Sequence, residues 1–171
     1  MSQASKKVDW CINKAQRELQ EIGFHRGLVK GDSDILLAEK HIIKAEHNLN
    51  AALYFEKGGF SDWSMSAFFY SLYHCFLAIL RKYGYESRNQ ECTLAVIESL
   101  KEEGEVDIDQ KFIDMLKITY LKETDHNVIK MREDFQYGVE LNFKRKDEFD
   151  ELTKICKEFI EITKEIILRE V

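Results

Sequence analysis

The sequence of 171 residues contains no proline and only eight glycines. Proline and glycine are the residues that most often interrupt regular structure and form tight turns between strands. A chain with so few of them favours long, uninterrupted helices. The length suits one domain, so residues 1–171 are predicted to form a single unit.

Apolar residues recur every three or four positions in several parts of the chain, which is the spacing of one helical face. This periodicity predicts four long helices, over residues 5–22, 34–57, 61–83 and 146–170, and two shorter ones, over residues 91–102 and 109–122. Short loops between long helices favour antiparallel neighbours. The predicted fold class is therefore all-α: an up-and-down antiparallel helical bundle of four long helices plus one or two short ones.

Three connecting regions lack this pattern. Residues 23–34 are punctuated by glycine, and residues 86–90 are polar, so both are predicted to be loops. In residues 124–143, Val139, Leu141 and Phe143 alternate like a strand, but a single strand has no partner for its backbone hydrogen bonds. We predict an irregular segment or a short helical turn there, leading into a loop.

The predicted helix over residues 61–83 is apolar around most of its circumference, so it should be the central, most buried helix. Ser64, Ser66, Ser71, His74 and Arg81 interrupt it, which argues against a membrane span, and small polar residues favour close packing between helices. No stretch resembles a signal peptide, so a cytoplasmic location is expected. The helix over residues 5–22 is a candidate added element.

The four cysteines are Cys11, Cys75, Cys92 and Cys156, scattered with no paired spacing. Zinc sites and disulfide frameworks usually show such spacing. We therefore expect neither a zinc site nor a disulfide, but four reduced cysteines in or near the core.

Net charge and motif content exclude several functions. The formal net charge of −6 argues against a broadly basic nucleic-acid-binding surface, although a local basic patch is compatible with it. Motifs of common hydrolases, phosphate-binding loops and zinc enzymes are absent. His41 and His47 are six residues apart, whereas two metal ligands on one helix need a spacing of three or four. No metal and no cofactor is expected.

The segment MREDFQYG, residues 131–138, is the strongest candidate for a binding site. The guanidinium group of Arg132 can hold a phosphate as a planar fork, and the phenol of Tyr137 can donate to a phosphate oxygen or stack on a base. Lys130 adds a second cation nearby. In the alternative interpretation, Arg132 is tied to a neighbouring carboxylate at a helix start.

Tyr70 and His74 lie in the aromatic run of the central helix. Tyrosine side chains can stack on nucleobases and histidine can exchange protons, so both residues are candidates for a ligand site. At helical spacing, such residues also commonly fill a core or a subunit interface.

The order of these features resembles the HEPN superfamily, in particular its small stand-alone archaeal and bacterial members. The resemblance covers about residues 35–170. Its most specific element is AFFYSLYHCFLAIL, which is similar to the A-x-Y-Y-A-x-x-H-A helix of that superfamily and places Phe69, Tyr70 and His74 on the pattern. The resemblance implies a bundle of four or five helices that dimerises and sometimes acts beside a minimal nucleotidyltransferase in toxin–antitoxin pairs.

Many members of the superfamily are metal-independent RNases that use an arginine followed, four to six residues later, by a histidine. Arg132 matches that arginine, but Tyr137 stands where the histidine would be expected. Tyrosine as a residue type has a pKa of about 10, so it is a poor proton shuttle at neutral pH. The usual catalytic route is therefore not expected here.

Three hypotheses follow. In the first, the chain is a homodimeric binding or regulatory protein for a nucleotide, an RNA or a minimal nucleotidyltransferase, with a degenerate RNase motif; its ligand-binding residues are Arg132, Tyr137, Tyr70, His74 and Lys130. In the second, the chain is a metal-independent endoribonuclease in which Arg132 binds the scissile phosphate and His74 or His126 replaces the missing base. In the third, it is a structural protein-interaction module.

Overall fold

The computed structural model describes residues 2–117, 128–143 and 146–169. In chain order the elements are α1 (Gln3–Ile22), β1 (Leu28–Lys30), α2 (Ile35–Lys57), α3 (Ser61–Lys82), β2 (Tyr85–Ser87), α4 (Gln90–Glu102), α5 (Gln110–Met115), α6 (Val128–Tyr137) and α7 (Lys146–Leu168). The predicted all-α bundle is confirmed. Among the described residues, the only sheet consists of β1 and β2.

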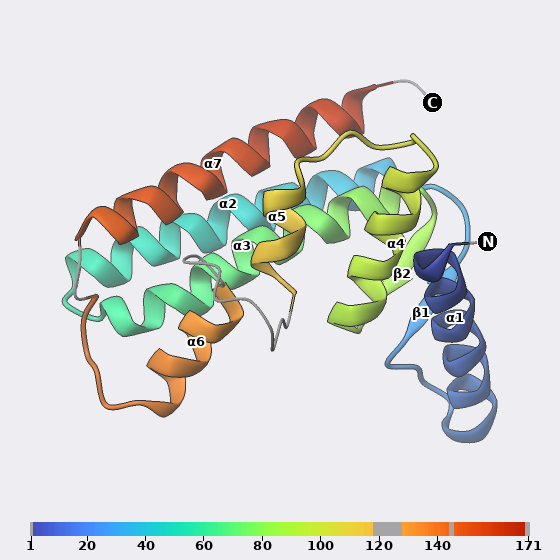
Figure 1. Cartoon of the computed structure of the whole chain (residues 1–171), viewed down its shortest axis with the longest axis horizontal. Coiled ribbons are helices and arrows are strands. Elements are labelled where there is room, and N and C mark those ends of the chain that lie inside the picture. Colours follow the sequence, from blue (N-terminus) through green and yellow to red (C-terminus); the bar gives the residue numbers. More distant parts are fainter. Residues whose placement is uncertain (1, 118–127, 144–145, 170–171) are drawn as a thin grey trace.

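Three long helices, α2, α3 and α7, form the body of the bundle (Figure 1). The turn at Gly58 and Gly59 makes α2 and α3 antiparallel neighbours. In contrast, α7 runs in the same direction as α3, because Phe68 contacts Phe149 and, further along both helices, Phe76 contacts Phe159. The short helices α4 and α6 pack against α3, while α1 stands at one end of the molecule on α4 and β1 (Figure 1).

Small residues bring α2 and α3 close together. Ala45 and Ala52 of α2 are fully buried opposite Ser71 and Ser64 of α3, and the two serine hydroxyls donate to the facing alanine carbonyls at 2.9 Å. From one pair to the next, the position on α2 rises by seven residues and the position on α3 falls by seven. This is the register of two antiparallel helices whose contacts repeat every seven residues. The close packing predicted for Ser64 and Ser71 is confirmed.

A buried lysine ties the ends of α3 and α7 together. Lys82, which is 4% exposed, donates from Nζ to the carbonyl oxygens of Ile166 and Arg169, both at 2.5 Å. These carbonyls belong to the last turn of α7 and the residue after it, where backbone acceptors have no helical partner and a cation is favoured.

The central helix α3 is long and apolar enough to cross a membrane by composition alone. Two thirds of that apolar window, 67%, is buried inside the protein. Its inward face includes Phe68, Phe76 and Leu72, all at most 1% exposed. Burial of each such side chain contributes about 1.5–3 kcal/mol, so α3 has the surroundings of a core helix, as predicted.

The prediction of loops at residues 23–34 and 86–90 is partly wrong, because residues 28–30 form β1 and residues 85–87 form β2. β1 pairs antiparallel with β2, with Val29 opposite Glu86. Strands of three residues are too short to show an alternating pattern. Gly84 permits the pairing: its φ is +76°, and a Cβ there would overlap the carbonyl oxygen of Gly31.

The region around residue 130 is more regular than predicted. Residues 128–137 form a helix of ten residues, α6, which buries Val128 and Ile129. In the helix predicted over residues 109–122, Phe112, Met115 and Leu116 are buried as expected, and α5 ends at Met115. Residues 118–122, including Thr119 and Tyr120, lie outside the described residues.

The expectation of four reduced cysteines is wrong for two of them. Cys11 of α1 and Cys92 of α4 form a disulfide, with their Cα atoms 5.9 Å apart. They are 81 positions apart in the chain, so no local spacing revealed the pairing, which arises because α1 folds back onto α4. Cys75 and Cys156 are free and buried, as predicted.

The disulfide predicts a specific thiol count. Denatured, unreduced protein should expose two reactive thiols, from Cys75 and Cys156, and reduction should expose four. Because closing so long a loop lowers the entropy of the unfolded chain, the disulfide stabilises the folded protein by about 4 kcal/mol. Reduction should therefore lower the melting temperature by on the order of 10 °C. Titration with a thiol reagent and thermal unfolding with and without a reductant check this.

The matched control is Cys75→Ser, which should remove one reactive thiol and leave the effect of the reductant unchanged. Four reactive thiols in unreduced wild-type protein would contradict the pairing.

Candidate functional site

Arg132 lies on an aromatic layer between α6 and α3. The Cζ atom of its guanidinium group is 4.2 Å from the centroid of the Phe69 ring. Its Nε is buried and has no hydrogen-bond partner among the described residues. Glu133 and Asp134 are both exposed, and no ion pair between Arg132 and a described carboxylate is formed. The interpretation in which Arg132 is tied to a neighbouring carboxylate is therefore not supported.

Three rings of α3 form this layer, here called the aromatic platform: Phe69, Tyr70 and Tyr73. Phe69 stacks on Tyr73 with ring centroids 5.8 Å apart and meets Tyr70 edge-on at 5.1 Å. The Tyr73 hydroxyl bonds to the Thr93 hydroxyl of α4 at 3.1 Å, and burial raises the pKa of Tyr73, which keeps it neutral. Tyr70 is 49% exposed. The platform is thus anchored on its inner side and open at Tyr70.

The structure separates Arg132 from Tyr137. Tyr137, at the end of α6, is 79% exposed, and five helical residues rotate its side chain by about 140° relative to Arg132. Lys130 is exposed on the same helix. His126 lies outside the described residues. Of the predicted ligand-binding residues, Arg132 and Tyr70 both contact the Phe69 ring, whereas Tyr137 lies on a different side of α6.

His74 has a partner that the sequence did not reveal. Its Nδ1 lies 2.9 Å from Nδ1 of His41 on α2. The close approach of α2 and α3 makes this contact possible, because Ala45 opposite Ser71 fixes the register that also places His41 opposite His74. The sequence relates His41 only to His47, on the same helix. The seven-residue repeat of small residues in α2 and α3 was the one signal that could have paired them.

The two histidines are neutral at neutral pH. Burial, followed by repulsion from His74 when that ring is protonated and from Arg81, lowers the pKa of His41 to about 4. Burial and then the charge of Lys44 lower the pKa of His74. In a neutral pair, one ring donates its Nδ1–H and keeps a lone pair on Nε2, while the accepting ring carries its proton on Nε2. The pair therefore offers one hydrogen-bond acceptor and one donor.

Arg132 and His74 occupy opposite flanks of the exposed face of α3. Arg132 sits over Phe69, and His74 follows Phe69 by five residues, about 7.5 Å along the helix and about 140° around it. Tyr70 lies between the two flanks. One chain therefore does not place Arg132 and His74 on the same phosphate group.

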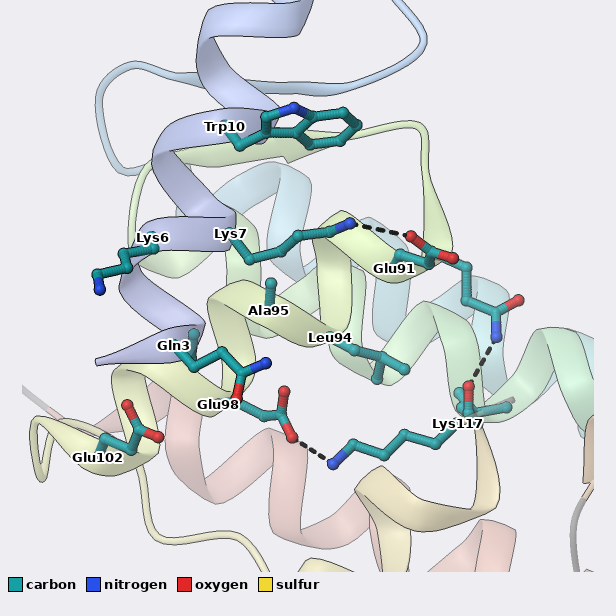
Figure 2. Close-up of a pocket in the computed structure, with 13 residues that line it drawn as sticks. Gln3, Lys6, Lys7, Trp10, Glu91, Leu94, Ala95, Glu98, Glu102 and Lys117 are labelled. Atoms are coloured by element: carbon teal, nitrogen blue, oxygen red, sulfur yellow. Dashed lines mark hydrogen bonds and ion pairs between the residues drawn. The ribbon is translucent and has the colours of Figure 1, made fainter. Parts of the chain in front are cut away.

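A cavity of about 780 Å³ lies elsewhere, between α1, α4 and the end of α5 (Figure 2). None of the site residues predicted from the sequence lines it. Its charged side chains interact across the cavity: Lys7 pairs with Glu91 at 3.2 Å, and Lys117 pairs with Glu98 (Figure 2). Within the described parts of the chain, no three His, Cys, Asp or Glu side chains are grouped as a metal site requires.

The histidine pair predicts a specific dependence of stability on pH. Because the pKa of His41 is about 4 when folded and 6.5 ordinarily, the unfolded chain binds more protons between these values. The contribution of His41 to stability is therefore complete above about pH 6.5 and falls as the pH drops towards 4. His41→Gln should reduce this loss, as measured by urea unfolding across that pH range.

The control is His47→Gln, at an exposed position of the same helix, which should lose stability with falling pH as the wild type does. Identical pH profiles for His41→Gln and His47→Gln would contradict the assignment.

Comparison with protein families is consistent with this architecture. The model of the HEPN domain matches residues 38–167, which is well over half of the chain and includes α3, α6 and both members of the histidine pair. No curated protein matches the chain. The match begins within α2, so α1 with Cys11 lies outside it, whereas Cys92 lies inside it. The chain therefore belongs to the HEPN family.

Proposed function

We propose that this HEPN protein is a homodimeric binding or regulatory protein that holds a nucleotide or an RNA at the aromatic platform under Arg132. The family match supports a nucleotide-related, RNA-related or regulatory role. The proposed protein partner is a cognate minimal nucleotidyltransferase, and the proposed setting is a cytoplasmic toxin–antitoxin or defence system.

The observation that carries this proposal is the state of the Arg132 guanidinium group. One face is occupied by the Phe69 ring, and the buried Nε lacks an acceptor among the described residues. Leaving a buried donor unpaired costs about 1–3 kcal/mol. A phosphate oxygen would satisfy this donor with a charge-assisted hydrogen bond, which is stronger than a neutral one.

Tyr70 supplies the second part of the proposed site. Its half-exposed ring is held edge-on against Phe69, so it presents a fixed aromatic surface beside Arg132. Stacking of a base on such a ring is worth about 1–3 kcal/mol. A phosphate on Arg132 and a base on Tyr70 are together the two halves of a nucleotide.

The proposed homodimer has a suitable surface on α2. Leu36, Ile43 and Tyr54 are 73%, 63% and 75% exposed and project from one side of that helix. HEPN domains commonly dimerise, and an apolar helix face of this kind is typical of a protein–protein contact.

The binding proposal predicts that Arg132→Ala weakens the affinity for a fluorescent single-stranded RNA about tenfold or more, since a hydrogen bond to a charged group is worth about 1.5–3 kcal/mol. Tyr70→Ala should weaken it by a similar factor through lost stacking. Fluorescence anisotropy titrations measure both, and Arg17→Ala, an exposed arginine of α1, serves as the control. Absence of wild-type binding to RNA and AMP, or equal affinities for Arg132→Ala and Arg17→Ala, would refute the proposal.

A second candidate function, a metal-independent endoribonuclease, is favoured by one observation: the neutral His41–His74 pair offers an acceptor and a donor together. In this alternative Arg132 binds one phosphate of the RNA and the pair acts on another. The pair would then serve as general base and general acid.

The enzyme hypothesis predicts RNA cleavage in the presence of EDTA that is lost in His74→Ala and retained in His47→Ala. Gel electrophoresis of labelled RNA measures it. Intact RNA, or cleavage that EDTA abolishes, would count against this function and leave the binding proposal in place.

A further inference from the structure

Three polar residues of α2 border the seam where α2 meets α3: His41, Lys44 and Asn48. Their spacing of three and four residues places them on one side of the helix. Ala45 and Ala52, which contact α3 directly, are fully buried, whereas His41 and Asn48 are partly exposed and Lys44 is exposed. The three polar side chains therefore follow the solvent side of the seam.

Asn48 is the most informative of them. Its Nδ2 is buried and has no hydrogen-bond acceptor among the described residues. It lies about midway between Ala45 and Ala52, whose partners on α3 are Ser71 and Ser64, so Asn48 is level with residues 67–68, about one turn before Tyr70. A buried amide donor thus lacks an acceptor on the α2 side of α3, about one helical turn from the open ring of the aromatic platform.

The charges around the seam favour an anion. The charged groups that act on the histidine pair are Lys44, on His74, and Arg81, on His41, and both are cations. Arg81 is paired with Glu86 at 3.1 Å, whereas Lys44 is exposed and acts on His74 from the solvent side of the seam. The accepting ring of the neutral pair adds an Nε2–H donor. Ammonium, amide and imidazole donors together suit a phosphate, and the ammonium charge disfavours a metal ion.

Two of the three buried side-chain atoms that lack a hydrogen-bond partner in the described structure flank Tyr70. Arg132 Nε is on the α6 side and Asn48 Nδ2 on the α2 side; the third, His25 Nδ1, lies near Glu86 at the far end of α3. The two flanks are separated by about the width of a helix with its side chains, about 10 Å. One phosphate group cannot satisfy both donors.

We propose that Lys44, Asn48 and the His41–His74 pair form a second phosphate subsite, so that the ligand is a single-stranded RNA crossing α3 rather than a mononucleotide. The inference rests on the proposed function, since it places a base on Tyr70 and one phosphate on Arg132. The next phosphate along the strand occupies the seam. Single-stranded nucleic acids are commonly bound by such a combination of a stacking ring and flanking cations.

Anisotropy titrations of a short fluorescent single-stranded RNA at several salt concentrations test the subsite. Lys44→Met should weaken binding about fivefold or more and reduce the slope of log affinity against log salt by about 0.7, the value for one phosphate contact on a single strand. The control is Lys57→Met, which removes the same charge from an exposed position at the end of α2. Its affinity for RNA and its salt dependence should stay close to those of the wild type. AMP, with one phosphate, should bind wild-type protein more weakly than the RNA does.

Asn48→Leu separates binding from structure. It removes the unpaired amide with little change in volume, so the melting temperature should stay the same or rise, while RNA affinity falls about tenfold. A residue with a purely structural role would show the opposite: a lower melting temperature and unchanged affinity in the remaining folded protein.

The outcomes distinguish the subsite from the proposed function. If Lys44→Met and Asn48→Leu bind RNA as Lys57→Met does, while Arg132→Ala loses binding, the second subsite is wrong and the binding function stands. If AMP binds as tightly as the RNA, the inference of a strand is overturned. If wild-type protein binds neither RNA nor AMP, the proposed function fails and the subsite with it.

Discussion

The close approach of α2 and α3 is the constraint on which the other features depend. Alanines on one helix and serines on the other let the two backbones come near enough for Ser64 and Ser71 to donate to carbonyls of α2. Larger side chains at these positions would push the helices apart. The His41–His74 contact, at 2.9 Å, exists only because this spacing is maintained. The same packing turns Tyr70 outward and leaves Lys44 and Asn48 at the edge of the seam.

The exposed side of α3 explains how an acidic protein can offer a site for an anion. The net charge of −6 is spread over the whole chain. Along this side of α3, in contrast, Arg132 covers Phe69 on one flank and Lys44 lies near His74 on the other. Local fields of this kind fall off within about 10 Å at ordinary salt concentration, so a local donor-rich strip is compatible with an unfavourable net charge.

Most of the fold could be predicted from the sequence because helices leave a periodic signal. The apolar repeats located α2, α3 and α7 closely, and glycines marked the ends of α2 and α3. The β1–β2 pair and the Cys11–Cys92 disulfide were missed, because both join segments more than fifty residues apart and depend on contacts that no local pattern records. α6 was underestimated because the alternation of residues just after it suggested a different structure.

The site was predicted only in part for the same reason. Arg132 and Tyr70 could be selected by residue chemistry and by the helix that carries them. That Phe69 connects them, and that Tyr137 turns away from Arg132, depends on how α6 rotates against α3. His41 and Asn48 became site candidates only once the register between α2 and α3 was known.

The disulfide has a consequence for how this HEPN domain can be isolated. A fragment limited to the matched residues 38–167 would contain Cys92 without Cys11. It would also uncover the side of α4 on which α1 packs. The Cys92 sulfur, which is disulfide-bonded and 2% exposed in the whole chain, would then be an accessible thiol beside newly exposed apolar surface. Such a fragment would cross-link and aggregate through α4 in air. The smallest fragment expected to stay folded and free of aggregation is therefore longer than the region matched by the family, because it must include α1.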